Sequence, residues 1–448
     1  MINFGIDKQT ILDLNIFPQA NGDLSVFNYY NQTKTKGGRD ALENMMRTPL
    51  NDLDEINSRI STISFIINNH FTFELKKELI DFIEYYLRQD IPILKNNPID
   101  SFFSWISDVI KPSNNYYVIA RGLEYLKIYI SLLSDFLGKI NSKDIPDFFQ
   151  LFKNEISELY TNPDFECLLN QKKEKLTFRQ ISRYDHLFRK KEKDRIERML
   201  KLTYLLEAYL SIALTAENNK LAFPVFIEST NLSLKINAIF HPFIENPVKN
   251  DVASLDNKNL CFVSGANMAG KSTFLKSVGL CVYLSHLGFP VPASSMETTV
   301  FNGLYTTINI SDNINKGYSH YYSEVKRVKD IALMLKEKKR LFVIFDELFR
   351  GTNVKDAYDG TLLITNGFAQ IKDSLFYISS HIVEVGQELE KLDKVSFKCF
   401  ESKLQGEQPI YNYKLIDGIS SERLGLVILK NEGILEIIDE IINEKVYQ

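Results

Sequence analysis

The sequence predicts a mixed fold: an all-helical N-terminal domain followed by an α/β domain with a mostly parallel sheet. From about residue 40 to 216, apolar residues recur at three- and four-residue spacings among long charged ones, as in ELKKELIDFIEYYL at 74–87. After about residue 220, short apolar runs bounded by Gly, Ser and Asp alternate with amphipathic segments, which is typical of a sheet covered on both faces. We therefore expect domains at 1–220 and 221–448.

Length and composition agree with two folded domains. The 448 residues are 44% hydrophobic and 25% charged, and the net charge of -4 argues against a nonspecific nucleic-acid coat or a basic membrane-binding protein. The four cysteines form no C-x-x-C pair, so we expect neither a zinc site nor a disulfide framework but a reduced, cytoplasmic setting. The longest apolar stretch, 209–216, is too short to span a bilayer, so no membrane partner is expected.

In the helical half, residues 171–201 differ locally in charge. They hold twelve Lys or Arg against five Asp or Glu, a net of +7. Two interpretations remain open: a solvated helix face with intrahelical ion pairs, or a surface that contacts the phosphate backbone of DNA.

The first element of the second half with clear chemistry is a glycine-rich loop. GANMAGKST at 265–273 fits G-x-x-x-x-G-K-[ST], follows the apolar run LCFVS and precedes the helix-like FLKSVGLCVYLSHLG. In such a loop the main-chain N–H groups point inward, and the following helix turns its positive end towards phosphates. We expect ATP and Mg²⁺ here, with Lys271 on the outer phosphates and Ser272 on the metal; the alternative is a glycine-rich turn without nucleotide. The expected nucleotide-binding residues of this loop are Gly265, Asn267, Met268, Gly270, Lys271, Ser272 and Thr273.

The next apolar runs end in polar residues that complete such a site. LFVIFDE at 341–347 places Asp346 and Glu347 at the end of a buried strand, where Asp346 would hold hydrated Mg²⁺ and Glu347 would orient an attacking water. LFYISSH at 375–381 places His381 at the same edge of the sheet, where it would sense the terminal phosphate. The alternative for His381 is a hydrogen-bonded, partly buried side chain.

These motifs together resemble a known family. The order GANMAGKST, GYSHYYSEV, FDELFRGTNVKDA and SSHIVEV is similar to the ATPase domain of the MutS family, the DNA mismatch-repair proteins and their paralogues. IFHPFIENPVKND at 239–251 resembles the segment that packs the base, which makes His241 and Asn250 candidates for that neighbourhood. The resemblance covers nearly the whole chain and is looser before residue 220.

The resemblance implies an ABC-type P-loop ATPase domain over 221–448, with a C-terminal helical dimerisation segment, after a helical core or lever domain over 1–220. It also implies a homodimer with two composite ATP sites, in which Ser319 of GYSHYYSEV reaches the terminal phosphate bound by the partner chain. The alternative for Ser319 is a turn before the helix at 324–337.

The resemblance further implies a DNA-binding ATPase that couples ATP binding and hydrolysis to clamping on DNA, in mismatch repair or recombination, together with a repair-protein partner. The sequence departs from the family where the mismatch-recognition module and connector would stand, since the chain opens almost directly on the helical core. A nucleotide-gated dimeric switch that binds a protein and not DNA is therefore the alternative.

Overall fold

The computed structural model describes residues 4–20, 22–88, 93–94, 114–140, 144–163, 165, 176–255, 257–308, 320–405, 408–420, 431 and 433–446. The chain forms two compact units. We call residues 1–29, 48–57 and 218–448 the sheet unit, and residues 30–47 and 58–217 the helical unit. Helices and mixed sheets together confirm the mixed α/β class.

The helical unit is built from amphipathic helices. In α5 the buried residues Leu79, Ile80, Ile83, Tyr86 and Leu87 fall at the three- and four-residue spacings that place them on one face. The elements of this unit, two of which run on into the sheet unit, are α3 (Lys36–Arg47), α4 (Leu53–Asn68), α5 (Lys77–Arg88), α7 (Asn114–Gly138), α8 (Asp147–Tyr160), α10 (Phe178–His186), the π-helix η1 (Leu187–Lys191) and α11 (Lys193–Asn219).

Helix α11, with 27 residues, is the longest described helix of this unit. Among the described residues it is the one helix long and apolar enough to cross a membrane by length and composition, and 61% of its most apolar window is buried inside the protein. Its Thr203 hydroxyl lies 2.6 Å from the Tyr129 hydroxyl of α7, and both side chains are fully buried. The apolar run at 209–216 is therefore part of a longer helix whose apolar residues pack in the core of this unit.

The sheet unit contains a six-stranded sheet in the order β10-β9-β4-β8-β7-β6. Strand β10 runs antiparallel to β9, and the other neighbours are parallel. All residues of β4, β7 and β8 are buried, as expected for central strands covered on both faces. The strands are β4 (Leu260–Gly265), β6 (Gly303–Thr307), β7 (Leu341–Asp346), β8 (Leu375–Ser380), β9 (Val395–Gln405) and β10 (Gln408–Asp417).

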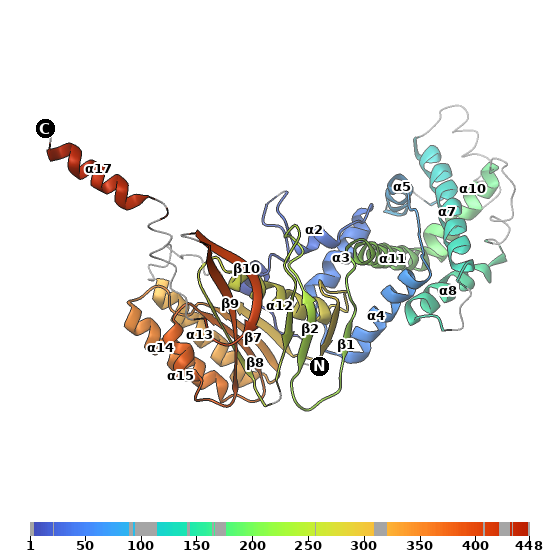
Figure 1. Ribbon diagram of the computed structural model, residues 1–448. Helices are drawn as coiled ribbons and strands as arrows, with labels where there is room; N and C mark the ends of the chain where they lie inside the picture. Colours follow the sequence, from blue (N-terminus) through green and yellow to red (C-terminus); the bar gives the residue numbers. More distant parts are fainter. Residues whose placement is uncertain are drawn as a thin grey trace. The chain divides into compact units, whose positions relative to one another are not determined.

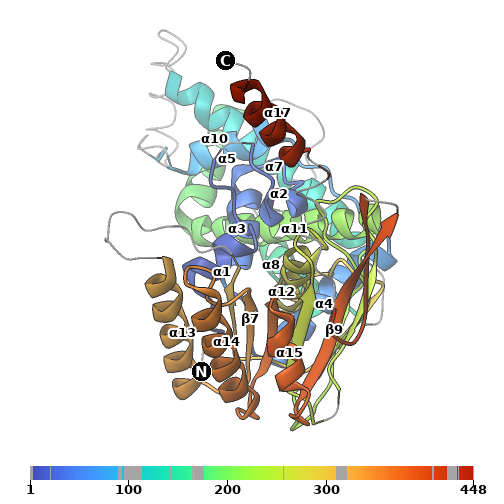
Figure 2. The ribbon, with the colours of Figure 1, turned by 60° about the vertical axis from the view of Figure 1, so that its left-hand side comes forward.

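Helices cover both faces of this sheet (Figures 1 and 2). On one face, α13 (His320–Glu337), α14 (Val354–Ala369) and α15 (Val383–Leu389) bury apolar side chains against β4, β7 and β8. On the other face, α12 (Lys271–His286) packs against the same central strands. The close approach of α12 is visible at Gly279, where a β-carbon would lie 3.0 Å from the Ile344 side chain of β7.

A second sheet, of four short strands, was not expected from the sequence. Its order is β1-β5-β2-β3, with β1 parallel to β5 and the other pairs antiparallel. The strands are β1 (Pro224–Phe226), β2 (Leu234–Ile239), β3 (Asn250–Ala253) and β5 (Ser295–Thr298). The chain ends in α17 (Ile434–Val446), a helical segment like the one expected near the C-terminus.

The first 29 residues belong to the sheet unit, whereas the sequence grouped them with the helical domain. Gly5 forms a parallel bridge with Gly303 at the start of β6. Asp13, at the end of α1 (Lys8–Asp13), accepts hydrogen bonds from the Thr306 hydroxyl at 2.7 Å and from the main-chain N–H of Ile308 at 2.9 Å. These partners lie almost 300 residues away in sequence, so local periodicity could not place this segment. The short helix α2 (Val26–Tyr30) follows and leads into the helical unit.

Candidate functional site

The glycine-rich loop connects strand β4 to helix α12, which is the predicted strand–loop–helix arrangement. Two glycines in it have backbone conformations that other residues avoid. Gly265 has φ 145° and Gly270 has φ 107°, and a β-carbon at Gly265 would lie 3.0 Å from the Phe400 carbonyl oxygen. Gly270 is also the N-cap of α12, so the turn directs the first N–H groups of that helix towards the loop.

Lys271, the first residue of α12, is folded back onto its own loop. Its Nζ donates to the carbonyl oxygens of Gly265 at 2.8 Å and Ala266 at 3.1 Å, and lies 3.2 Å from Glu347 Oε1. The Lys271 side chain is 4% exposed. A buried ammonium group held by two carbonyls and one carboxylate is positioned to meet an anion that enters the loop.

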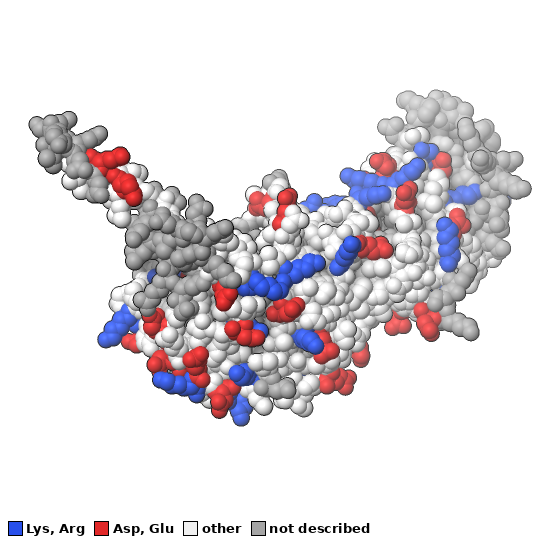
Figure 3. Space-filling view, viewed as in Figure 1, with Lys and Arg blue, Asp and Glu red and all other residues white. Residues whose placement is uncertain are grey.

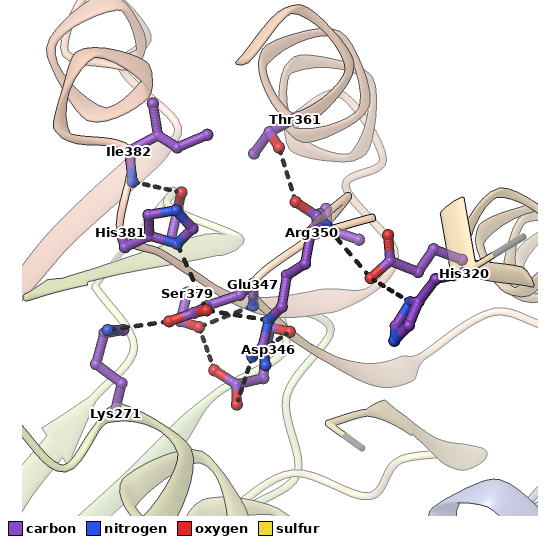
Figure 4. A network of polar contacts seen from close by, with 12 residues as sticks. Lys271, His320, Asp346, Glu347, Arg350, Thr361, Ser379, His381 and Ile382 are labelled. Atoms are coloured by element: carbon purple, nitrogen blue, oxygen red, sulfur yellow. Dashed lines mark hydrogen bonds and ion pairs between the residues drawn. The ribbon is translucent and has the colours of Figure 1, made fainter. Parts of the chain in front are cut away.

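The two predicted acidic residues follow one another at the end of β7, and both contact Ser379 of β8 and Arg350. Asp346 is buried and accepts a hydrogen bond from the Ser379 hydroxyl of β8. Glu347 has φ 52°, a left-handed conformation unusual for a residue with a side chain, and its N–H donates to Ser379 O and Oγ, both at 3.1 Å. This main-chain anchoring turns the Glu347 side chain towards Lys271 (Figure 4).

Glu347 is surrounded by three basic side chains. Besides Lys271, Arg350 Nε lies 3.0 Å and His381 Nδ1 lies 3.4 Å from its Oε2. Burial raises the pKa of Glu347, but a hydrogen bond from His381 and the charges of Lys271, Arg350 and His381 outweigh it, and together they lower this pKa to about 2. Glu347 is therefore ionised throughout the physiological range.

A cavity of about 740 Å³ opens beside this network. Its wall is formed by the glycine-rich loop, the start of α12, Glu347, Arg350, and residues from the 239–250 segment, β9 and β10. The predicted residues that line it are His241, Asn250, Asn267, Met268, Gly270, Lys271, Ser272, Thr273 and Glu347. A volume of this size is in the range of small-molecule sites.

His241 and Asn250 both line the cavity, in different ways. Burial, and to a lesser extent the charge of Lys276, lowers the pKa of His241 to about 4, so its ring is neutral near pH 7. The Asn250 side chain donates to the Tyr413 carbonyl at 3.0 Å and accepts from the Leu415 N–H at 2.8 Å. Its amide thus fixes β10 beside the cavity.

Several predicted residues stand apart from the cavity wall. Gly265, Asp346 and His381 do not line it, although Asp346 and His381 contact residues that do. His381 is half exposed. Ser319 lies outside the described residues.

Several cavity residues were not singled out from the sequence, among them Phe240, Arg350, Phe400 and Tyr413. Arg350 stands inside the quoted FDELFRGT run, three residues from Glu347, so its charge was the available signal. Phe400 and Tyr413 come from β9 and β10, and only the strand pairing brings them here.

The donor set also fits a magnesium ion. Mg²⁺ in proteins keeps several waters and takes one or two protein oxygens. The Ser272 hydroxyl is exposed in the cavity, and the Asp346 carboxylate ends β7, a buried strand separated from β4 by β8, so these two residues would hold the ion.

Fold and site define the class of protein: a mixed α/β chain whose central sheet carries a strand–loop–helix turn of the kind that cradles phosphate, facing an acidic strand end. Residues 261–446 match the family model described as MutS domain V. The chain is 22% identical to the DNA mismatch repair protein MutS of Thermotoga petrophila over 96% of its own length and 64% of the relative's, and 23% identical to that of Petrotoga mobilis over 97% and 64%. With that of Lachnoclostridium phytofermentans it is 29% identical over 54% of this chain and 27% of the relative.

This chain is therefore similar to MutS domain V over residues 261–446, and to DNA mismatch repair proteins named MutS over most of its length. It spans less than two thirds of the length of these relatives.

Proposed function

We propose that this protein is an ATP hydrolase that works as a homodimer. The observation that carries the proposal is the buried Lys271–Glu347 ion pair at 3.2 Å, which joins the glycine-rich loop to the end of β7 at the cavity wall. One side chain of this pair would bind the outgoing phosphate and the other would orient water, so the reaction needs both at one place.

Each residue would have a distinct role in hydrolysis. The N–H groups of the 265–270 loop and Lys271 would bind the phosphates, and Ser272 and Asp346 would hold Mg²⁺, which supplies charge neutralisation when bound. Glu347, ionised and anchored on Ser379, would accept a hydrogen bond from the attacking water. His381 beside Glu347 would respond to the terminal phosphate, and the base would pack near His241.

In this proposal the site of one chain is completed by Ser319 of the other, whose hydroxyl would stabilise charge on the outer phosphate only in the closed dimer. Nucleotide can favour the closed dimer only by binding it more tightly than the open one. Within the MutS family this cycle would serve to clamp on DNA in repair or recombination, in the cytoplasm and with a repair-protein partner.

The alternative remains a nucleotide-gated switch that binds a protein and not DNA. The observation that favours it is the pairing of basic residues in the 171–201 segment with carboxylates of α8, such as Arg198 with Glu155 at 3.0 Å. Such pairs leave fewer cations for a phosphate backbone.

The test of hydrolysis is the variant Glu347→Gln. We expect ATP binding to persist while turnover falls by roughly 100-fold or more, because the amide can no longer accept a proton or orient water as a carboxylate does. Steady-state phosphate release and equilibrium binding of ATP measure the two effects. Hydrolysis by this variant at the normal rate would refute the role of Glu347, and absence of any ATP binding or hydrolysis by the unmodified protein would refute the proposed function.

A further inference from the structure

Glu324, the fifth residue of α13, is a buried carboxylate that the proposed mechanism does not use. It is 6% exposed, and burial raises its pKa. Its Oε1 accepts a hydrogen bond from the main-chain N–H of Arg350 at 3.4 Å and lies 3.7 Å from His320 Nδ1. Its Oε2 is buried and has no hydrogen-bond partner among the described residues, so burial of this carboxylate is costly. A costly arrangement of this kind at the edge of a site calls for a function.

The segment that Glu324 holds is packed tightly against the start of α13. At Gly351 a β-carbon would lie 2.6 Å from the Tyr321 main-chain nitrogen and 2.9 Å from His320 Cβ, so only glycine fits there. The rings of Tyr321 and Phe349 lie 5.7 Å apart. The start of α13 and residues 349–351 therefore form one packed contact, with the Glu324 carboxylate as its polar centre.

Arg350 links this packed contact to the carboxylates of Asp346 and Glu347. Its N–H is fixed by Glu324, while its guanidinium lies 3.0 Å from Glu347 Oε2 and 3.5 Å from Asp346 Oδ2. The side chain of Arg350 is 43% exposed and lines the cavity, so its position depends on where its main chain is held (Figure 4).

We propose that Glu324 is a positioning residue for hydrolysis: it holds the main chain of Arg350 and Gly351 against α13 and thereby keeps the Arg350 guanidinium on Glu347. This inference rests on the proposed function for its effect on turnover. The contact itself is formed by residues of the chain alone. Glu324 acts through Arg350, so the effects of removing the two are not additive.

The experiment is a double-variant cycle on the full chain with Glu324→Ala, Arg350→Ala and the combination. We expect Glu324→Ala to lower kcat about tenfold while the affinity for ADP changes less than about twofold. In the Arg350→Ala background, the same change should lower kcat by less than a further factor of about two. Glu324→Gln retains a carbonyl acceptor for the N–H groups and should recover most of the turnover. Glu337→Ala, an exposed carboxylate on the same helix, serves as the matched control.

A second measurement separates this inference from the proposed function. Hydrogen exchange of the Arg350 and Gly351 amides in nucleotide-free protein should be faster in Glu324→Ala than in Glu337→Ala or Glu324→Gln. The positioning role would be overturned if Glu324→Ala lowered kcat by the same factor with and without Arg350→Ala. It would also be overturned if hydrogen exchange of the amides at 350–351 did not change. If the unmodified protein does not hydrolyse ATP, the proposed function fails, and the exchange result still decides whether Glu324 holds this segment.

Discussion

Glu347 shows how one residue is fixed by groups from several elements. Its main chain is anchored on Ser379 of β8, and its carboxylate faces Lys271 of α12 and His381 beyond β8. A left-handed backbone at a non-glycine residue costs on the order of 1 kcal/mol and persists only where surrounding contacts impose it. The strained backbone and the three basic side chains coincide at the residue proposed to orient water.

The low pKa of Glu347 predicts a pH dependence of stability. Its pKa is about 2 in the folded protein against 4.5 ordinarily, so its stabilising contribution is fully present above about pH 4.5 and is lost as pH falls towards 2. The contribution is at most on the order of 3 kcal/mol. In Glu347→Gln the unfolding free energy should be lower than in the unmodified protein at pH 7, and this gap should narrow between pH 5 and pH 3. A gap that stays constant across this range, after comparison with the exposed Glu337→Gln, would contradict the assignment.

Among the site residues, those that belong to a short contiguous motif could be predicted from the sequence. The loop glycines and Lys271 are read from a contiguous motif, and Glu347 from the end of an apolar run. The contact between Glu324 and Arg350 joins residues 26 positions apart, and the Asn250 bonds to β10 span more than 160 positions. Such contacts depend on packing, for which a single sequence carries no local signal.

At the level of elements, the start of α3 depends on a side chain from α11. Glu207 accepts from the N–H groups of Lys34 and Thr35 and from the Thr35 hydroxyl, while that hydroxyl accepts from the Gly38 N–H at 2.9 Å. A carboxylate from a different helix thus satisfies donors at the N-terminus of α3, where negative charge is favourable.

This cap predicts a loss of stability in Glu207→Ala. Removing an ionised acceptor of three hydrogen bonds should lower the unfolding free energy by about 2–4 kcal/mol. Glu217→Ala is the matched control on the same helix, because Glu217 is exposed and lies 3.6 Å from His70 in a surface pair worth less than about 1 kcal/mol. Urea unfolding followed by circular dichroism measures both, and equal midpoints for the two variants would contradict the capping role.

The elements that the sequence predicted are the long and the apolar ones. The runs at 260, 341, 375 and 394 became β4, β7, β8 and β9, because strands in the middle of a covered sheet are mostly apolar. The four-stranded sheet was missed because strands of three to six residues with mixed polarity resemble loops. The bridge of Gly5 to Gly303 was also missed, because a single residue pair leaves no pattern in the sequence.

For the whole molecule, the distribution of charge on the surface bears on whether the protein binds DNA. Lys and Arg are interspersed with Asp and Glu on the face shown in Figure 3. In the described part of the basic segment, 176–201, Arg195 pairs with Glu158 and Arg198 with Glu155, two carboxylates of α8 that lie outside the segment. The local excess of +7 therefore overstates the charge available to a phosphate backbone.

Exposed lysines of η1 remain available, and they allow the two functions to be distinguished. If the protein binds duplex DNA through this segment, affinity should fall steeply with salt, and Lys190→Ala/Lys191→Ala should weaken binding and reduce the slope of log K against log salt by about 2, one for each lost phosphate contact. Lys336→Ala/Lys372→Ala, which removes two exposed lysines of the sheet unit, should leave the slope unchanged. Fluorescence anisotropy with a labelled duplex at several salt concentrations measures both variants. If the control variant reduces the slope equally, the DNA contact lies elsewhere. If no DNA binding is detected at low salt while ATP hydrolysis is intact, the protein-binding switch is favoured. A protein that neutralises several phosphates releases counterions and therefore binds DNA measurably at low salt.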